Sequence, residues 1–159
     1  MVLSVVGADL LVENDYFRAK LVQENTVRAF GLPFTIVRST QFFESFDAIM
    51  NASAVNGVLR LAPIMVQPIA ADEAAASIAR LVVGSPANAI VEMGGPERLP
   101  LYDLARELFT ASDDPRPVEL DRNVGYFGVS LAKDGLLPST ESTMGVLTFH
   151  DWLSSSMAA

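Results

Sequence analysis

The chain has 159 residues, 50% of them hydrophobic, and its 19 acidic residues outnumber its 11 basic residues, for a net charge of −8. This length and composition are typical of one globular domain. The acidic balance, without any basic cluster, argues against a nucleic-acid-binding module, because phosphate contacts need grouped Lys and Arg. The chain has no cysteine and a single histidine, His150, which excludes disulfides, thiolate nucleophiles and zinc sites of the usual kinds. We therefore predict no metal site.

The hydropathy pattern contains no membrane-spanning segment. No apolar run approaches the roughly 18 residues that cross a bilayer, and the N-terminal stretch lacks the basic start and cleavage site of a signal peptide. We expect a cytoplasmic protein with neither a membrane nor a nucleic acid as partner.

The first third of the chain has the pattern of a strand followed by a helix. Residues 2–6 are apolar and β-branched, which predicts a strand covered on both faces. Residues 13–30 then change to a helical period, with Asn14 or Asp15 as the cap and Gly31 after the end. The stripe expected to face the sheet consists of Ala19, Val22, Thr26, Ala29 and Phe30.

A second buried strand is predicted at residues 34–37, followed by a loop over residues 38–41 and a helix over residues 42–54. A strand, a helix and another strand in this order predict a parallel βαβ unit.

Later elements are shorter. Strands are expected at residues 58–61, 65–69, 89–93 and 118–120, and helices after Asp72, after Pro100 and over residues 148–157. Their apolar faces are predicted to be Ala75, Ile78, Ala79 and Val82; Leu101, Leu104, Ala105 and Leu108; and Phe149, Trp152 and Leu153. The predicted fold class is α/β: a parallel sheet with flanking helices and smaller C-terminal elements, in one domain over residues 1–159.

Tyr16 and Lys20 are four residues apart, so on a helix both side chains share one face. A tyrosine has an ordinary pKa near 10, and a nearby cation stabilises the phenolate, which favours proton exchange at neutral pH. Ser4 ends the preceding strand, and ligands bind where strand ends meet the following helices. These three residues are candidate catalytic groups. The alternative interpretation of Tyr16 and Lys20 is an ordinary pair on a solvated helix face.

Ser4, the Tyr16-to-Lys20 motif and three further segments resemble one known family. The further segments are FTIVRSTQFF at residues 34–43, QPIAAD at residues 67–72 and EMGGPE at residues 92–97. They are similar to the atypical short-chain dehydrogenase/reductases of the NmrA-like, NAD(P)-binding group, and the resemblance extends from Val2 to about Leu153. It implies a Rossmann-type fold and hydride transfer between NAD or NADP and a small carbonyl or quinone-like substrate.

The resemblance also implies roles for individual residues. Tyr16 would be the general acid/base, Lys20 would bind the nicotinamide ribose, and Ser4 would orient a carbonyl. Thr40, Gln41 and Phe42 would line the nicotinamide end of the pocket. In this arrangement residues 1–55 form the catalytic βαβ unit and residues 56–159 the substrate-side elements.

One part of the family pattern is missing. Members begin with a strand, a glycine-rich turn and a helix that holds the pyrophosphate, and no such turn occurs here; Gly125-Tyr126-Phe127-Gly128 does not supply it. We interpret the chain as the C-terminal portion of such a domain, without the adenosine and pyrophosphate half-site and inactive in isolation. Its first strand would lack a neighbour, so we expect self-association, or pairing with a separate N-terminal half, through that sheet edge.

Other interpretations remain open at this stage. The chain could belong to a regulatory protein that senses NAD(P) without turnover, or it could be an inactive truncated domain. The pairs Tyr126-Phe127 and Phe42-Phe43 could line a hydrophobic pocket or pack in the core.

Overall fold

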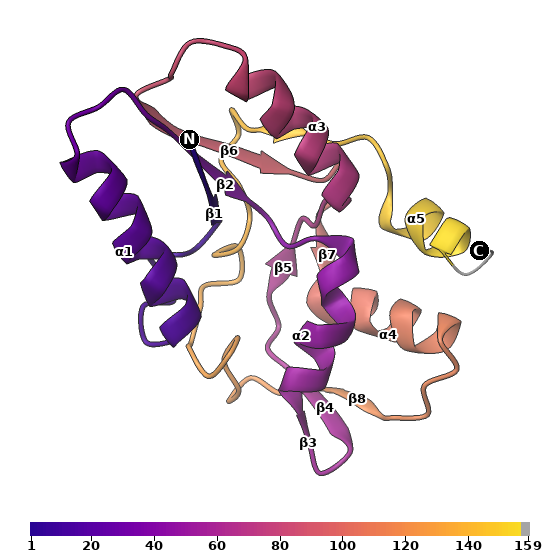
Figure 1. Cartoon of the computed structure of the whole chain (residues 1–159). Coiled ribbons are helices and arrows are strands. Elements are labelled where there is room, and N and C mark those ends of the chain that lie inside the picture. Colours follow the sequence, from indigo (N-terminus) through magenta and orange to yellow (C-terminus); the bar gives the residue numbers. More distant parts are fainter. Residues whose placement is uncertain (157–159) are drawn as a thin grey trace.

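The computed structural model describes residues 1–156 as a mixed α/β fold, as predicted (Figure 1). The main sheet is parallel, with the order β1 (Val2–Val5), β2 (Thr35–Ser39), β6 (Ala89–Gly94) and β9 (Thr143–Met144). A second sheet contains β3 (Ala54–Val55), β4 (Val58–Leu61) and β8 (Val118–Leu120), and a third pairs β5 (Met65–Val66) with β7 (Leu99–Pro100). The helices are α1 (Asp15–Ala29), the 3-10 turn η1 (Phe43–Ser45), α2 (Phe46–Ser53), α3 (Ala71–Val82), α4 (Leu101–Ala111) and α5 (Phe149–Ser156).

The predicted βαβ unit is confirmed, because β1 and β2 pair in parallel on either side of α1 in the chain. β2 continues through Arg38 and Ser39, which had been predicted to lie in a loop. The strand expected over residues 65–69 is shorter and ends at Val66.

Opposite faces of the main sheet contact different helices. Ser4 and Arg38 are register partners, and their side chains meet Glu24 of α1. Val37 and Met93 instead pack with residues of α3. Because side chains alternate along a strand, α1 and α3 lie on opposite sides of the sheet (Figure 1).

The predicted apolar stripe of α1 is wrong. Ala19, Val22, Thr26, Ala29 and Phe30 are all exposed, and the buried residues of this helix are Phe17 and Glu24. The inward face contains a buried carboxylate that pairs with Arg38 of the sheet, and apolar periodicity cannot detect such a face. Asn14 is confirmed as the helix cap, since its side chain accepts a hydrogen bond from the Tyr16 N–H.

The predicted start and face of α3 are also wrong. Asp72 lies inside the helix, and the Glu44 carboxylate accepts from the N–H of Ala71 at its start. Of the predicted face, Ala75, Ala79 and Val82 are exposed, whereas Ile78 is partly buried and packs against the core as expected; the fully buried residues are Ala74 and Ser77. A distant carboxylate thus replaces the local cap.

β1 is the outermost strand of the main sheet, and only part of it is covered. Ser4 is buried, whereas Leu3 on the other face is 37% exposed. The prediction of cover on both faces is therefore wrong for this strand, and none of the strands within residues 1–156 pairs with its outer side.

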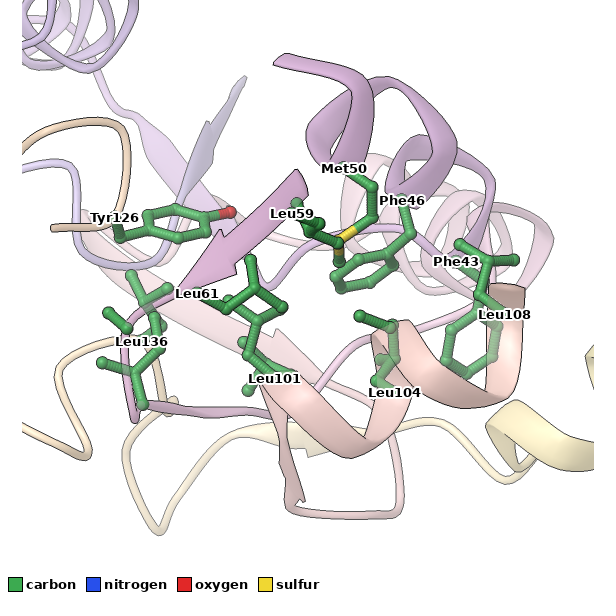
Figure 2. Packing of buried hydrophobic residues seen from close by; sticks show 14 of the residues in the cluster. Phe43, Phe46, Met50, Leu59, Leu61, Leu101, Leu104, Leu108, Tyr126 and Leu136 are labelled. Carbon is green, nitrogen blue, oxygen red and sulfur yellow. The ribbon is translucent and has the colours of Figure 1, made fainter. Parts of the chain in front are cut away.

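The main hydrophobic core lies between α2, α4, α5 and the small sheets rather than under the main sheet (Figure 2). The predicted face of α4 is confirmed, because Leu101, Leu104, Ala105 and Leu108 are all buried. Phe43, Phe46 and Phe149 fill the centre of this core. The terminal helix is confirmed over Phe149–Ser156, and Met157 of the predicted range lies outside the described residues. No helix within residues 1–156 has the length and apolar character needed to span a membrane.

Candidate functional site

A cavity of about 440 Å³ opens at the carboxyl ends of β1 and β2. Its walls come from β1, the first turns of α1, the residues after β2, one face of α2 and the segment at residues 126–127. All six predicted site residues line it: Ser4, Tyr16, Lys20, Thr40, Gln41 and Phe42. The structure therefore brings together residues that are up to 38 positions apart in the chain.

Tyr16 and Lys20 project from the start of α1 toward this cavity. Tyr16 is 57% exposed, and its ring centre lies 5.9 Å from Lys20 Nζ. Lys20 Nζ also donates a hydrogen bond of 3.2 Å to the main-chain carbonyl of Leu3 in the edge strand. The cation is thus held between the phenol ring and β1, at the mouth of the cavity.

Ser4 makes a short hydrogen bond that the sequence did not predict. Its Oγ donates to Glu24 Oε1 at 2.6 Å, and Glu24 is completely buried. Arg38 binds both oxygens of the same carboxylate, each at 2.9 Å, through Nε and Nη2. Because a hydroxyl has one hydrogen, the donor capacity of Ser4 is fully used by Glu24.

The Glu24 carboxylate stays ionised despite its burial. Burial alone would raise the pKa of Glu24, but hydrogen bonds from Arg38 and Ser4, together with the charges of Arg38 and Arg28, hold that pKa below its ordinary value of 4.5. In return, the hydrogen bonds to Glu24 raise the pKa of Arg38. On α1, a residue of interest recurs every four positions at Tyr16, Lys20 and Glu24, so these side chains lie on one face of the helix. The ion pair between Glu24 and Arg38 therefore holds against the sheet the same face that carries the phenol and the amine.

The residues after β2 contain polar atoms without partners. Ser39 Oγ, Thr40 Oγ1 and both polar side-chain atoms of Gln41 are sealed from solvent and make no hydrogen bond with the described residues. All three residues line the cavity. An unsatisfied buried polar group costs about 1–3 kcal/mol, so three residues in sequence with such groups are an unusual feature of this wall.

Tyr126 and Phe127 complete the cavity from a distant part of the chain. Tyr126 pairs with Val129 through two main-chain hydrogen bonds, and Phe127 and Gly128 between them have φ of 48° and 83°. Two positive φ values define the tight hairpin turn that keeps the flanking residues rigid. The sequence left open whether Tyr126 and Phe127 line a pocket or pack in the core; both line the cavity, and Tyr126 is also part of the main core. No role at the site was predicted for Tyr126, and the Gly-x-x-Gly spacing around it is the signal that could have indicated the turn. Phe42 lines the cavity, whereas Phe43 belongs to the core.

Gly125 allows this hairpin to close, which gives a testable prediction. A Cβ added at Gly125 would lie 2.4 Å from the carbonyl carbon and oxygen of Val129. Gly125→Ala is expected to lower the free energy of unfolding by about 1–3 kcal/mol, as for other overpacked sites, when measured by urea denaturation. Gly84→Ala is the matched control, because the atoms nearest to an added Cβ there are 3.5 Å away. Equal stability of the two variants would contradict this account of the turn.

Comparison with known proteins relates the chain to two solved structures. No family model and no curated protein matches it. UDP-N-acetylglucosamine 4-epimerase from Bacillus cereus matches with a TM-score of 0.57 and 17% identity over 99% of this chain and 66% of its own length. RMD from Pseudomonas aeruginosa, solved as a complex with NADPH, matches with a TM-score of 0.51 and 11% identity, over 99% of this chain and 59% of its own length.

These matches concern the fold. The chain spans 66% and 59% of the lengths of the two proteins, and at 17% and 11% identity the likeness extends to architecture alone. With its parallel sheet between helices on both sides, the chain has a Rossmann-like fold.

Proposed function

We propose that this chain is the portion of an NAD(P)-dependent oxidoreductase, of the NmrA-like short-chain reductase group, that carries the proton-transferring residues and the nicotinamide end of the cofactor site. The observation that carries the proposal is the position of Thr40 and Gln41, whose buried polar atoms lack partners, in the same cavity as Tyr16 and Lys20. In this proposal residues 1–159 act as one domain, with residues 1–55 as the catalytic unit and residues 56–159 as the substrate side.

The unpartnered atoms fit a nicotinamide in their chemistry. The side chain of Gln41 offers a donor and an acceptor next to each other, and the carboxamide of nicotinamide presents the complementary pair. Thr40 and Ser39 add hydroxyls, and Phe42 adds an apolar ring to the same wall. A bound nicotinamide would supply or accept the hydride.

The chain's own residues would handle the proton and the substrate. When a carbonyl is reduced, the hydride adds to its carbon and Tyr16 gives a proton to its oxygen, so that the product is an alcohol. Lys20 supplies a positive charge beside the phenol ring and a donor for a ribose hydroxyl. The apolar side chains of Ile49, Ala52 and Phe127 would enclose the rest of the substrate and exclude water.

The pyrophosphate and adenosine would be held by a part of the protein outside these residues. The solved structures are longer than this chain, and the outer edge of β1 pairs with no strand in the described part of the chain. An exposed strand edge is a template for pairing. We propose that the missing strands bind there and that, without them, two copies of the chain associate through the same edge.

A titration with cofactor fragments tests the proposed function. The chain is expected to bind reduced nicotinamide mononucleotide saturably and NADPH or NADH no more than a few times more tightly, in an assay by calorimetry. Gln41→Leu should weaken this binding about tenfold, since it removes a pair of hydrogen bonds. Gln23→Leu, at an exposed position of α1, is the control and should bind normally.

Two outcomes would contradict the proposal in different ways. If the mononucleotide does not bind saturably, the cavity is not a nicotinamide site. If NADPH binds more than about a hundredfold more tightly than the mononucleotide, a difference of nearly 3 kcal/mol in binding free energy, the second part of the proposal is wrong. The chain would then itself contain the pyrophosphate site that we propose lies in another part of the protein.

A further inference from the structure

Tyr126 has a buried side chain next to the proposed proton donor. It is 4% exposed, lines the cavity, and its ring lies at one end of the main hydrophobic cluster (Figure 2). The Phe17 ring packs against both tyrosines, with its centre 5.2 Å from that of Tyr16 and 6.5 Å from that of Tyr126. The hairpin turn after Tyr126 holds this ring in place.

The hydroxyl of Tyr126 is available to a ligand. Within residues 1–156 it makes no hydrogen bond, although hydroxyls on buried rings usually find a partner, and its oxygen is not among the polar atoms that are sealed from solvent. Burial and the nearby Tyr16 raise the pKa of Tyr126, so this hydroxyl keeps its proton and stays a donor over the whole range in which proteins are stable.

The Ser4 hydroxyl, in contrast, is already used as a hydrogen-bond donor within the protein. It donates to Glu24 at 2.6 Å, and that carboxylate is buried, ionised and fixed by Arg38. To bind a carbonyl oxygen, Ser4 would have to leave a buried anion short of one hydrogen bond, which costs about 1–3 kcal/mol or more. The resemblance implies that the Ser4 hydroxyl orients the substrate carbonyl, but in the structure this hydroxyl donates its hydrogen bond to Glu24.

We propose that Tyr126 is a catalytic residue whose hydroxyl donates a hydrogen bond to the carbonyl oxygen of the substrate, in the place that the resemblance assigns to Ser4. This inference rests on the proposed function. A carbonyl oxygen has two lone pairs, so it can accept from Tyr126 and Tyr16 together. Tyr16 transfers its proton to the oxygen, while Tyr126 retains its own and orients the oxygen.

The same geometry indicates the class of substrate. The apolar part of the cavity wall includes Phe127, Ile49 and Ala52, and the single cationic side chain among the lining residues is Lys20. A phosphate group on the substrate would find a single positive charge in the cavity, and the proposal already assigns that charge to the nicotinamide ribose. The substrate is therefore an uncharged, largely apolar carbonyl compound, of which acetophenone is the simplest probe.

The test uses acetophenone labelled with carbon-13 at the carbonyl and the isosteric hydrocarbon α-methylstyrene, without any cofactor. Tyr16→Phe removes the other phenolic donor. In this variant we expect the bound carbonyl resonance to move downfield and acetophenone to bind about tenfold more tightly than the hydrocarbon, the value of about one good hydrogen bond. Adding Tyr126→Phe should abolish both effects, whereas adding Ser4→Ala should leave both unchanged.

Each other outcome would overturn the inference. If Ser4→Ala abolishes the shift and the preference, the serine is the donor; if the Tyr16→Phe protein shows neither, no donor other than Tyr16 reaches the carbonyl. Circular dichroism checks that every variant is folded. Should Tyr126→Phe fail to fold, Lys20→Met, Thr40→Val and Gln41→Leu are added one at a time to the Tyr16→Phe, Ser4→Ala protein, because these residues line the same cavity and loss of both effects in any one of them would assign the donor to that residue instead. Because nicotinamide is absent from this test, its failure is separate from failure of the mononucleotide titration.

Discussion

Glu24→Ala is expected to lower the free energy of unfolding by about 3–5 kcal/mol, measured by urea denaturation at neutral pH. Removing the carboxylate leaves Arg38, whose side chain is 10% exposed, without both contacts to its buried partner, and leaves the Ser4 hydroxyl without an acceptor. A loss of this size is a large part of the stability of about 5–15 kcal/mol that is usual for a domain. Asp9, which also binds Arg38, is 53% exposed and cannot replace a buried partner.

The control is Arg28→Ala. Arg28 contacts the same carboxylate at 3.5 Å, but its side chain is 40% exposed, so its loss should cost less than about 1 kcal/mol. Equal effects of Glu24→Ala and Arg28→Ala would contradict the account of the buried pair. Removing Glu24 and Arg38 together should cost less than the sum of the separate losses, because the double variant buries no unpaired charge.

The same pair predicts a dependence of stability on pH. The folded pKa of Glu24 is lower than its ordinary value of 4.5, so its contribution is fully present above that value. The contribution is lost as the pH falls below 4.5 through the folded pKa. Glu24→Gln should therefore be less stable than the unchanged chain at neutral pH, and the difference should shrink below pH 4.5.

The sequence predicted helices best where apolar burial alone decides which face points inward. On α4, Leu104 and Leu108 pack in the main core, and their spacing identified the buried face. On α1 the buried residues are Phe17 and Glu24, and a glutamate does not mark an inward face in any hydrophobic pattern. The arginine that neutralises it is 14 positions away on strand β2, and its position against α1 is known only once β1 and β2 are paired.

The site residues, too, were predicted where local sequence determines their position and missed where only the tertiary fold does. Ser4, Tyr16 and Lys20 come from one strand and the next helix, so local spacing and the direction of the strand were enough to place them at one edge of the sheet. Tyr126 enters from a turn that no regular element predicts, more than a hundred residues later in the chain. Only the tertiary fold shows that it shares a cavity with Tyr16.

Tyr16→Phe is expected to lower kcat by about 10²–10⁴-fold in the protein completed by a glycine-rich, phosphate-binding part, when the reduction of carbonyl compounds is followed with NADPH. The variant keeps the ring that contacts Phe17 at 5.2 Å and loses the group that gives the proton. Tyr16 is 57% exposed, so the fold should tolerate the change. Affinity for NADPH should stay within about twofold, because the proposed contacts to nicotinamide come from Thr40 and Gln41.

The matched control is Tyr102→Phe, which removes a phenolic hydroxyl from α4, outside the residues that line the cavity, and should leave kcat unchanged. Lys20→Met gives a second comparison: loss of the charge 5.9 Å from the Tyr16 ring should lower kcat and also raise the KM for NADPH, since the same amine is proposed to hold the ribose. If the completed protein binds NADPH but reduces no carbonyl compound, and Tyr16→Phe leaves that affinity unchanged, the cavity serves to sense the cofactor. A tyrosine that gives its proton to the substrate must instead change kcat and leave cofactor binding intact, so the two functions are distinguished by one pair of measurements.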